Sequence, residues 1–185
     1  MSGARGRILI VSGPSGVGKS SVCARLLDSE HMVPSVSATT RPPRGNEQEG
    51  VNYFFLSREE FERRRDAGEF LEWAVVHGTL YGTPAQPVLD HLASGRHVLL
   101  DIDVQGAATL RERGLPVSSV FLRPPSMEEL RRRLTHRRDT PPDEVERRMA
   151  RAAEEMREAF RYDVVVTNAE LDETVRQIHE FLERA

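Results

Sequence analysis

The sequence predicts an α/β fold in which helices cover both faces of a parallel sheet. Four short runs of apolar, largely β-branched residues have the length of buried strands. They are apolar throughout and do not alternate with polar residues, which is typical of parallel strands buried on both sides. Helical segments lie between and after them, and this alternation is the pattern of helices packed on a parallel sheet.

The elements of this core follow one another along the chain. The expected strands cover residues 7–12, 98–101, 117–122 and 164–166. The expected helices cover residues 19–28, 85–94, 105–113 and 171–184. Gly95 and Gly114 directly follow two of these helices, where glycine commonly ends the last helical turn.

The chain departs from this alternation at residues 35–83. Two strand-like pieces, residues 52–56 and 70–76, flank one charged helical segment there. Ser57 followed by Glu60 is a capping-box pair that predicts the start of this helix. We therefore expect a small mixed α/β lobe inserted into the core.

A second departure covers residues 126–160, which are almost wholly helical. Ser126 and Glu129 form another capping-box pair, and the two prolines after Thr140 stand where a second helix is expected to begin. An arginine-rich helical hairpin is the result. We expect a single domain that covers residues 1–185. Its core is formed by residues 1–34, 84–125 and 161–185.

Composition excludes several classes of protein. The 26 basic and 29 acidic residues leave a net charge of −3, which argues against a nucleic-acid or membrane-surface binder held by overall charge, although a local basic patch stays open. A single cysteine, Cys23, rules out an internal disulfide. The sequence has no apolar run of about 18 residues and no cationic-apolar leader, so we expect a cytoplasmic protein without nucleic-acid or membrane partners.

Residues 13–20 match the pattern G-x-x-x-x-G-K-[ST] between an expected strand and an expected helix. In such a phosphate-binding loop, glycines let backbone N–H groups point at phosphate oxygens, and the helix N-terminus adds its positive end. Lys19 would reach the outer phosphates and Ser20 would ligate Mg²⁺. The alternative is a strand-to-helix turn that holds glycines by chance. The residues assigned to nucleotide binding here are Gly13, Pro14, Ser15, Gly16, Val17, Gly18, Lys19, Ser20 and Ser21.

Lys19 stands out in the composition as well. It is the single lysine among the 26 basic residues, and all the others are arginines. An ammonium group is a compact point charge with three rotatable donors, whereas a guanidinium is a broad planar fork. A lysine at this one position indicates a confined phosphate site, and we expect Lys19 to be catalytic.

Four further segments complete a pattern: residues 35–44 (SVSATTRPPR), 72–73 (EW), 81–83 (YGT) and 101–106 (DIDVQG). With the phosphate-binding loop, and in this order along nearly the whole chain, they make the sequence similar to the guanylate kinase family. The resemblance implies transfer of a phosphoryl group from ATP to GMP with Mg²⁺, giving ADP and GDP. It also implies a GMP-binding lobe at residues 35–83, a lid at residues 126–160, and ATP, GMP and dGMP as partners. The oligomeric state is left open.

Other function classes are kept beside this one. A catalytically inactive guanylate-kinase-like module would bind protein ligands, but Lys19, Ser20 and the lid arginines are all present. A GTPase would carry Asn-Lys-x-Asp on a late strand, and no lysine follows Lys19. Another small phosphotransferase with the same loop is the third class. The active GMP kinase is the favoured hypothesis.

The acceptor needs a second anion site. Arg41 and Arg44 are separated by two prolines, which keep the intervening backbone extended and hold two guanidiniums for bidentate donation to one phosphate. Tyr53 and Tyr81 would add hydroxyl donors, and the resemblance places the matching tyrosines at the acceptor phosphate. It also implies a catalytic role for Arg41. The alternative is a pair of solvated loop arginines with two half-buried tyrosines.

Guanine offers two adjacent N–H donors beside its O6 acceptor, so its site calls for carboxylates next to a hydroxyl donor. Glu72 and Asp103 supply carboxylates, and Ser37 and Thr83 supply hydroxyls. All four match the guanine-contacting positions of the family that the sequence resembles. Glu72 lies in an apolar run, so the alternative for it is an exposed strand face. Which acid contacts N2 is left open.

Asp101 ends an apolar strand, where an α/β sheet presents side chains to its ligand crevice. An acid beside the strand of a phosphate-binding loop commonly holds Mg²⁺ through water, so Asp101 and Ser20 are the expected metal residues, and Asp101 is counted as catalytic. Asp103 faces the same way if the strand continues, because side chains alternate. The alternative is that Asp101 caps the helix that starts near Gln105.

The hairpin supplies cations that can close over the transferring phosphoryl group. Arg133 and Arg137 are four residues apart on one helix face, and Arg148 and Arg151 are three apart on the next helix. The resemblance implies catalytic roles for Arg133, Arg137 and Arg148. It also implies that Arg137 and Asn168 bind ATP, although Asn168 is equally well a turn or cap residue. Residues 138–140 depart from the family pattern. The family usually has Gly, then Thr or Gln, then Asp after the arginine, whereas this chain has Arg138, Asp139 and Thr140. A solvated face paired with glutamates is expected for Arg131, Arg132, Arg138 and Arg147.

Overall fold

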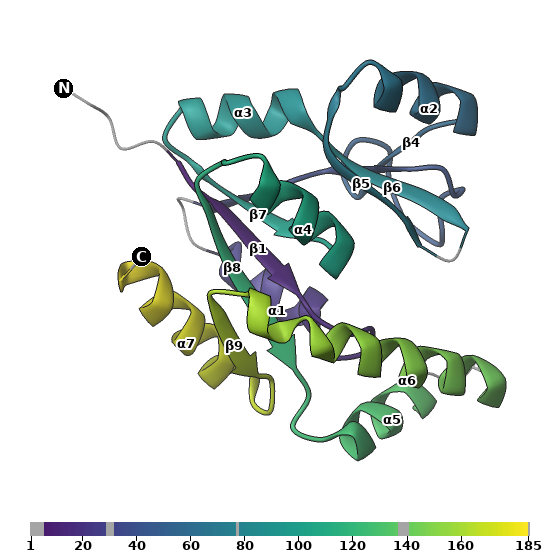
Figure 1. Cartoon of the computed structure of the whole chain (residues 1–185), viewed down its shortest axis with the longest axis vertical. Coiled ribbons are helices and arrows are strands. Elements are labelled where there is room, and N and C mark those ends of the chain that lie inside the picture. The colour runs from purple at the N-terminus through teal and green to yellow at the C-terminus, as the bar shows by residue number, and fades with distance from the viewer. Residues whose placement is uncertain (1–5, 29–31, 77, 137–140, 185) are drawn as a thin grey trace.

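A five-stranded parallel sheet forms the centre of the protein. The computed structural model describes residues 6–28, 32–76, 78–136 and 141–184. The strands of this sheet are β1 (Ile8–Ser12), β2 (Met32–Pro34), β7 (His97–Asp101), β8 (Val117–Arg123) and β9 (Val164–Thr167). They lie in the order β2-β7-β1-β8-β9, and each neighbouring pair is parallel (Figure 1). The predicted parallel sheet is confirmed.

Helices cover both faces of this sheet. They are α1 (Lys19–Leu26), α3 (Ala85–Ala93), α4 (Val104–Glu112) and α7 (Leu171–Arg184). Ile8 and Ile10 of β1 pack in one apolar cluster with α3 and α4, whereas Leu9 and Val11 pack in a second cluster with α1 and α7. This is the two-residue alternation of a strand buried on both faces. The predicted α/β core is therefore confirmed.

A separate four-stranded sheet forms the inserted lobe. It consists of β3 (Ser37–Thr39), β4 (Tyr53–Phe55), β5 (Phe70–Val76) and β6 (Thr79–Pro84), together with helix α2 (Arg58–Asp66). The order is β4-β3-β6-β5, with one parallel and two antiparallel pairs. Phe61 of α2 stacks on Phe70 with the ring centroids 4.5 Å apart. Ser57 accepts a hydrogen bond from the N–H of Glu60, so the predicted cap is confirmed.

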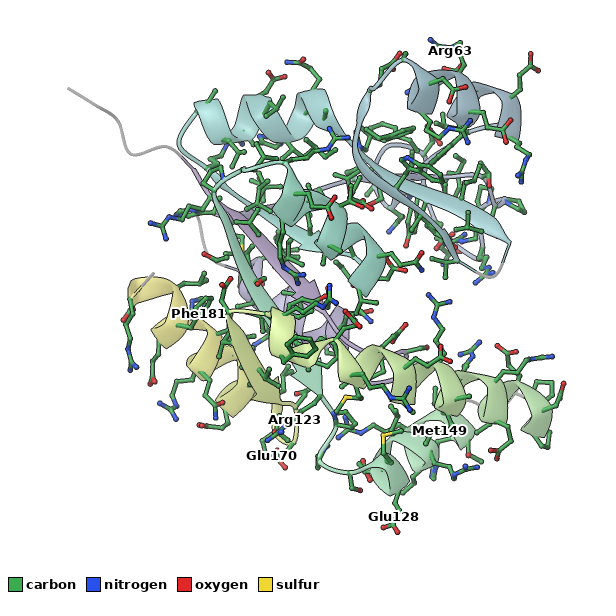
Figure 2. The ribbon with its side chains drawn as sticks, in the orientation of Figure 1. Arg63, Arg123, Glu128, Met149, Glu170 and Phe181 are labelled. Atoms are coloured by element: carbon green, nitrogen blue, oxygen red, sulfur yellow. The ribbon has the colours of Figure 1, made fainter. Side chains whose placement is uncertain are left out.

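The helical hairpin consists of α5 (Met127–Thr135) and α6 (Pro142–Arg157), and the short helix η1 (Ala159–Arg161) connects it to β9. Figure 2 shows Met149 between the two helices and Glu128 on the outer side. Met149 belongs to a small apolar cluster of the hairpin alone, which contains Leu130, Leu134, Val145 and Ala152. The hairpin thus has a core of its own. It projects from the central sheet on the same side as the lobe (Figure 1).

Three strands of the structure were not expected from the sequence. β2 and β3 have three residues each, which is too short for a periodic pattern to appear. β2 also ends in Pro34, which an edge strand tolerates and a central strand does not. β6 contains Gly82 and Pro84, both of which weaken a strand pattern. No helix within the described ranges is long and apolar enough to cross a membrane.

Candidate active site

The loop between β1 and α1 has the backbone that a phosphate cradle requires. Gly16 and Gly18 have φ angles of 86° and 100°, in a region that favours glycine. A β-carbon at Gly13 would lie 2.3 Å from the carbonyl oxygen of Leu122, so no side chain fits there. Lys19 begins α1, and its Nζ donates to the carbonyl oxygen of Gly13 over 2.7 Å. The loop therefore folds back over its own lysine, at the N-terminus of α1.

Two predicted nucleotide-site residues hold this loop from outside. Nδ2 of Asn168 donates to the carbonyl oxygen of Val17 over 2.7 Å, and Oδ1 accepts from the hydroxyl of Thr174 over 3.0 Å. Nη1 of Arg133 donates to the same Val17 oxygen over 3.2 Å. Both terminal nitrogens of Arg133 also donate to the backbone oxygen of Asn168, over 3.3 Å. Arg133 and Asn168 therefore support the shape of the loop. The catalytic role of Arg133 and the contact of Asn168 with ATP stay predictions.

Asp101 lies beside Val11 of β1, close to the start of the loop. Solvent reaches Asp101, yet the surrounding protein raises the pKa of its carboxyl by desolvation, and the charge of Lys19 offsets part of this rise. Asp101 is thus an acid that solvent can reach and that lies close enough to Lys19 to feel its charge. Ser20 is exposed in the first turn of α1.

These two oxygen donors fit a hydrated Mg²⁺ ion. Mg²⁺ prefers oxygen ligands, keeps several waters and is usually bound through one or two carboxylates together with substrate phosphates. Asp101 and Ser20 supply a carboxylate and a hydroxyl at the phosphate-binding loop. Within the described ranges, no group of three or more His, Cys, Asp or Glu side chains gathers as a metal site. The candidate site thus consists of one carboxylate and one hydroxyl, which suits an ion that keeps several waters.

Asp103 does not continue the strand of Asp101, so the condition under which the two side chains would face the same way is not met. β7 ends at Asp101, and Asp103 is the N-cap of α4, where its Oδ1 accepts from the N–H of Gly106 over 3.0 Å. The helix begins there because the carboxylate satisfies an N–H of the first turn that has no partner within the helix. Asp103 rather than Asp101 is thus the cap, and capping, not strand alternation, orients it.

Glu72 meets Asp103 at this first turn of α4. Glu72 is 4 % exposed and accepts a hydrogen bond from the hydroxyl of Thr83 over 2.6 Å. A β-carbon at Gly106 would lie 2.5 Å from Oε2 of Glu72, so the carboxylate lies directly against this glycine. Desolvation raises the pKa of Glu72 to about 7, and the charge of Asp103 adds to the rise. The alternative of an exposed strand face for Glu72 is excluded.

Arg41 lies between both predicted tyrosines. Its Nε donates to the hydroxyl of Tyr81 over 3.2 Å, and its guanidinium carbon lies 4.9 Å from the ring centroid of Tyr53. Glu47 accepts hydrogen bonds of 2.6 and 2.7 Å from Arg41, which lower the pKa of Glu47 to about 2. The backbone N–H of Arg44 donates to the same carboxylate. Glu47 therefore holds Arg41 beside two tyrosines.

The remaining lobe residues are less enclosed. The side chain of Arg44 is exposed, so only Arg41 of the two predicted phosphate ligands is held by neighbours. Ser37 is half-buried on β3, in register with Tyr53 of β4. The lobe sheet thus brings Ser37, Tyr53, Tyr81, Glu72 and Thr83 onto neighbouring strands.

Most described arginines of the hairpin pair with its acids. Arg148, half-buried in α6, donates to Glu144 over 2.8 Å, and its contact with substrate stays a prediction. Arg137 and residues 138–140, where the family pattern is broken, lie outside the described residues. The predicted solvated pairs that can be checked are confirmed: Arg131 with Glu146, Arg132 with Glu129, and Arg147 with Glu144.

Three residues of the site received no role of their own from the sequence. Glu47 lies in an irregular loop, and no pattern distinguishes it from the other surface acids. Arg151 and Glu155 lie on α6 among many charged residues, although their spacing of four does indicate a shared face. Burial raises the pKa of Glu155, and the charges of Arg151 and Lys19 lower it in part, so α6 faces the loop lysine.

The comparison with known proteins decides the family. A family profile described as guanylate kinase matches residues 5–185 of the chain. The chain belongs to the guanylate kinase family. Every described residue of the candidate site lies within the match.

Individual guanylate kinases match this chain along most of their length. The guanylate kinase of Symbiobacterium thermophilum is 48 % identical over 175 residues, covering 94 % of this chain and 83 % of its own. The guanylate kinase of a Chelativorans species is 50 % identical over 171 residues, covering 91 % of this chain and 78 % of its own. The crystal structure of the guanylate kinase from Anaplasma phagocytophilum is 40 % identical and covers 98 % of this chain and 86 % of its own, with a TM-score of 0.81.

Proposed function

We propose that the protein transfers the γ-phosphoryl group of ATP to GMP, giving ADP and GDP. The observation that carries this proposal is the convergence of Glu72 and Asp103 on one helix turn, in a chain whose phosphate-binding loop holds Lys19. Two carboxylates match the paired N–H donors of guanine, and the hydroxyl of Thr83 lies with them. An adenine edge would leave a carboxylate facing a lone pair. Membership in the guanylate kinase family supports the same acceptor.

The residues divide this work between two ends of the site. Residues 13–21 bind the phosphates of ATP, Asn168 lies toward its base, and Arg137 of the lid also binds ATP. The lobe at residues 35–83 binds GMP or dGMP: Arg41, Arg44, Tyr53 and Tyr81 hold the acceptor phosphate, and Ser37, Glu72, Thr83 and Asp103 hold guanine. Arg41 lies beside the hydroxyl of Tyr81 and the ring of Tyr53. Its bidentate bond to the carboxylate of Glu47 shows that its guanidinium is oriented to hold an oxyanion, which supports the phosphate assignment.

The transfer step adds negative charge that the protein has to stabilise. Lys19 neutralises the outer phosphates, and Arg133, Arg137 and Arg148 of the hairpin at residues 126–160 act as the lid. Asp101 and Ser20 would hold Mg²⁺, which when bound neutralises charge on the β- and γ-phosphates. We place this reaction in the cytoplasm, in line with a single cysteine, Cys23, that is buried and packed in the core.

The direct test is an assay of ADP formation with ATP and Mg²⁺ against GMP, AMP, CMP and UMP. We expect GMP to be the one monophosphate of the four that supports rapid turnover. Turnover with AMP or a pyrimidine nucleotide instead would contradict the guanine assignment. If no monophosphate supported turnover, the result would favour an inactive module that binds protein ligands.

GMP use is expected to weaken as the pH falls through 7. Glu72 has a pKa of about 7 in the free protein, and only the ionised carboxylate is purely an acceptor for guanine N–H groups. The value of kcat/KM reports the free enzyme, so for GMP it should be level above pH 7 and fall up to about tenfold per unit below it. Guanine favours the ionised form, so GMP binding should also release a proton, which calorimetry in buffers of different ionisation enthalpy detects.

The control separates Glu72 from the substrate. The phosphate of GMP itself titrates at about pH 6, so part of any fall in kcat/KM at low pH comes from the substrate. In Glu72→Gln the inflection near pH 7 should disappear, while the one near pH 6 stays. An unchanged inflection near pH 7 in this variant would show that another group is titrating.

Arg148→Ala should lower kcat more than it raises the KM for GMP. A lid arginine contacts the phosphoryl group chiefly as charge develops in the transition state, so its loss is expected to cost about 10²-fold or more in kcat. Arg132→Ala is the matched control, because Arg132 is exposed and pairs with Glu129 on its own helix. Steady-state kinetics of both variants checks the assignment, and equal effects at the two positions would contradict it.

A further inference from the structure

Arg151 of α6 connects two parts of the site. Its Nε donates to Glu155 of the same helix over 2.9 Å, and its Nη2 donates to Oδ2 of Asp103 on α4 over 3.3 Å. The three side chains are only partly exposed, at 28 % for Arg151, 18 % for Asp103 and 11 % for Glu155. Arg147 and Arg148 of the same helix instead pair with acids of α6. Arg151 is therefore the described arginine of α6 whose ion pairs reach another element.

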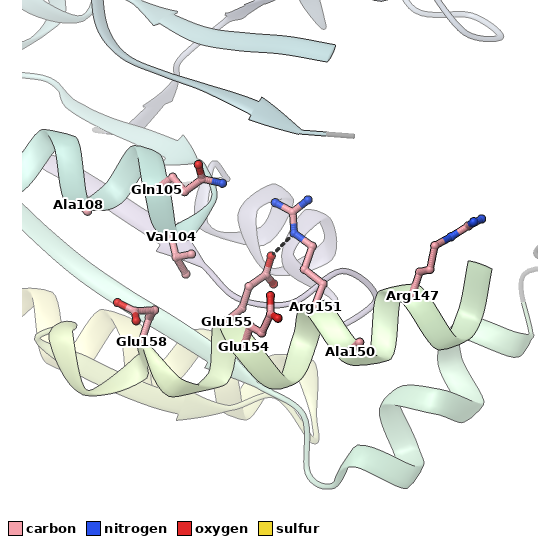
Figure 3. A pocket seen from close by; sticks show the side chains of 9 residues that line it. All are labelled: Val104, Gln105, Ala108, Arg147, Ala150, Arg151, Glu154, Glu155 and Glu158. Atoms are coloured by element: carbon pink, nitrogen blue, oxygen red, sulfur yellow. Dashed lines mark hydrogen bonds and ion pairs between the residues drawn. The ribbon is translucent and has the colours of Figure 1, made fainter. Parts of the chain in front are cut away.

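Arg151 and Glu155 line a pocket of about 730 Å³ between α4 and α6, next to Asp103 at the start of α4. Figure 3 shows Arg151 reaching across this pocket from α6, with Glu155 bound beneath it and Gln105 on the opposite helix. Arg147 also lines the pocket, one turn earlier on α6, but points away from Glu155 (Figure 3). Of these two arginines, Arg151 contacts both Glu155 and Asp103, whereas Arg147 only lines the pocket.

Asp103 is held in a single orientation by its donors. Oδ1 accepts from the N–H of Gly106 over 3.0 Å, and Oδ2 accepts from Arg151 and from Nε2 of Gln105, each over 3.3 Å. The helix cap fixes Oδ1, and Arg151 is the charged donor that, together with Gln105, fixes Oδ2. The orientation of Oδ2 depends on Arg151, which belongs to the hairpin.

We propose that Arg151 is a positioning residue that sets Asp103 for guanine and links acceptor binding to the position of α6. This inference rests on the proposed function, because it assigns guanine to Asp103. It adds to that function a residue outside the phosphate-contacting arginines. Arg151 acts through Asp103 and touches neither phosphate.

The test replaces Arg151 by glutamine. An amide at position 151 can still donate to Glu155 four residues on, so the buried acid keeps a partner, but it lacks the charge and the reach for Asp103. Partly exposed ion pairs have modest strength, so Arg151→Gln should raise the KM for GMP about fivefold and change kcat less than about twofold. Arg151→Lys keeps the charge and should recover at least half of the loss. Arg147→Gln is the matched control and should leave both constants within about twofold of wild type.

A double-mutant cycle with Asp103→Asn isolates the proposed link. If Arg151 acts through Asp103, adding Arg151→Gln to Asp103→Asn should change the KM for GMP less than about twofold. A full fivefold loss in both backgrounds would overturn the inference, and so would a loss confined to kcat, or no loss in Arg151→Gln. Thermal unfolding of each variant shows that the comparison is made on folded protein, and Arg151→Lys serves if the glutamine variant does not fold. A wild-type protein without GMP kinase activity would instead overturn the proposed function.

Discussion

Lys19→Ala should lower kcat by at least about 10³-fold while the protein stays folded. Lys19 Nζ is held at the carbonyl oxygen of Gly13, and its charge acts on Asp101 and Glu155, so its loss removes the central cation of the site. Removing one preorganised charge or donor from a developing anion commonly costs about 10²- to 10³-fold, and Lys19 serves as both. Its side chain does not belong to the apolar clusters, so the fold should survive.

Lys19→Arg should fail almost as badly. A planar guanidinium does not fit where a compact ammonium bonds its own loop over 2.7 Å. Arg25→Ala is the control on the same helix, because Arg25 makes an exposed ion pair with Asp172 and should not affect turnover. Kinetics together with thermal unfolding provides the check. Near wild-type turnover in Lys19→Arg would contradict the idea that this single lysine marks a confined phosphate site.

Glu72→Gln should lower kcat/KM for GMP about 30- to 150-fold at pH 8, which corresponds to about 2 to 3 kcal/mol. The hydroxyl of Thr83 donates to one oxygen of Glu72. A glutamine oxygen would accept that bond, which turns the amide NH₂ toward the place where guanine presents its own donors. Two donors would then face each other in a buried site. AMP should lose far less, because it does not present that pair of donors.

Three acceptors and two variants decide this prediction. Wild-type protein should prefer GMP over AMP by about 10⁴-fold or more, since a site of buried polar groups rejects a partner that leaves them unpaired. IMP has N1–H and O6 but no 2-amino group, so it should be poor and should be affected less by changing the acid that contacts N2. We expect kcat/KM for GMP, IMP and AMP on Glu72→Gln and Asp103→Asn to identify that acid. Undiminished GMP preference in both variants would refute the guanine assignment and leave kinase activity intact.

The core was predictable because its signals are local. The strands that were expected are apolar along their length, and the capping pairs at Ser57 and Ser126 stand in the sequence itself. The loop at residues 13–20 was predictable because its chemistry depends on residues next to one another. β2 could not be predicted in the same way, since a three-residue edge strand takes its place from β7 and not from its own pattern.

The site shows the same division between local and distant causes. Glu72 was selected for its chemistry, but its burial depends on Gly106, far away in the sequence, so an exposed strand face could not be excluded beforehand. The strand ends at Asp101 as expected, but the helix cap was considered for Asp101 and is made by Asp103, because the helix begins at Val104, one residue earlier than expected. Glu47 was missed, and Arg151 was given no role of its own, because each gains its role from one partner that only the fold brings near, Arg41 and Asp103 respectively.

The phosphate-binding loop also has a place in the order of folding. Val17 is tied to Arg133 and to Asn168, which follow it by 116 and 151 residues. A chain under synthesis therefore presents the complete motif long before the residues that hold it exist, and closing such distant contacts is slow compared with forming the neighbouring strand and helix. The ability to bind ATP should consequently be among the last properties that a nascent chain acquires, after its central strands have already paired.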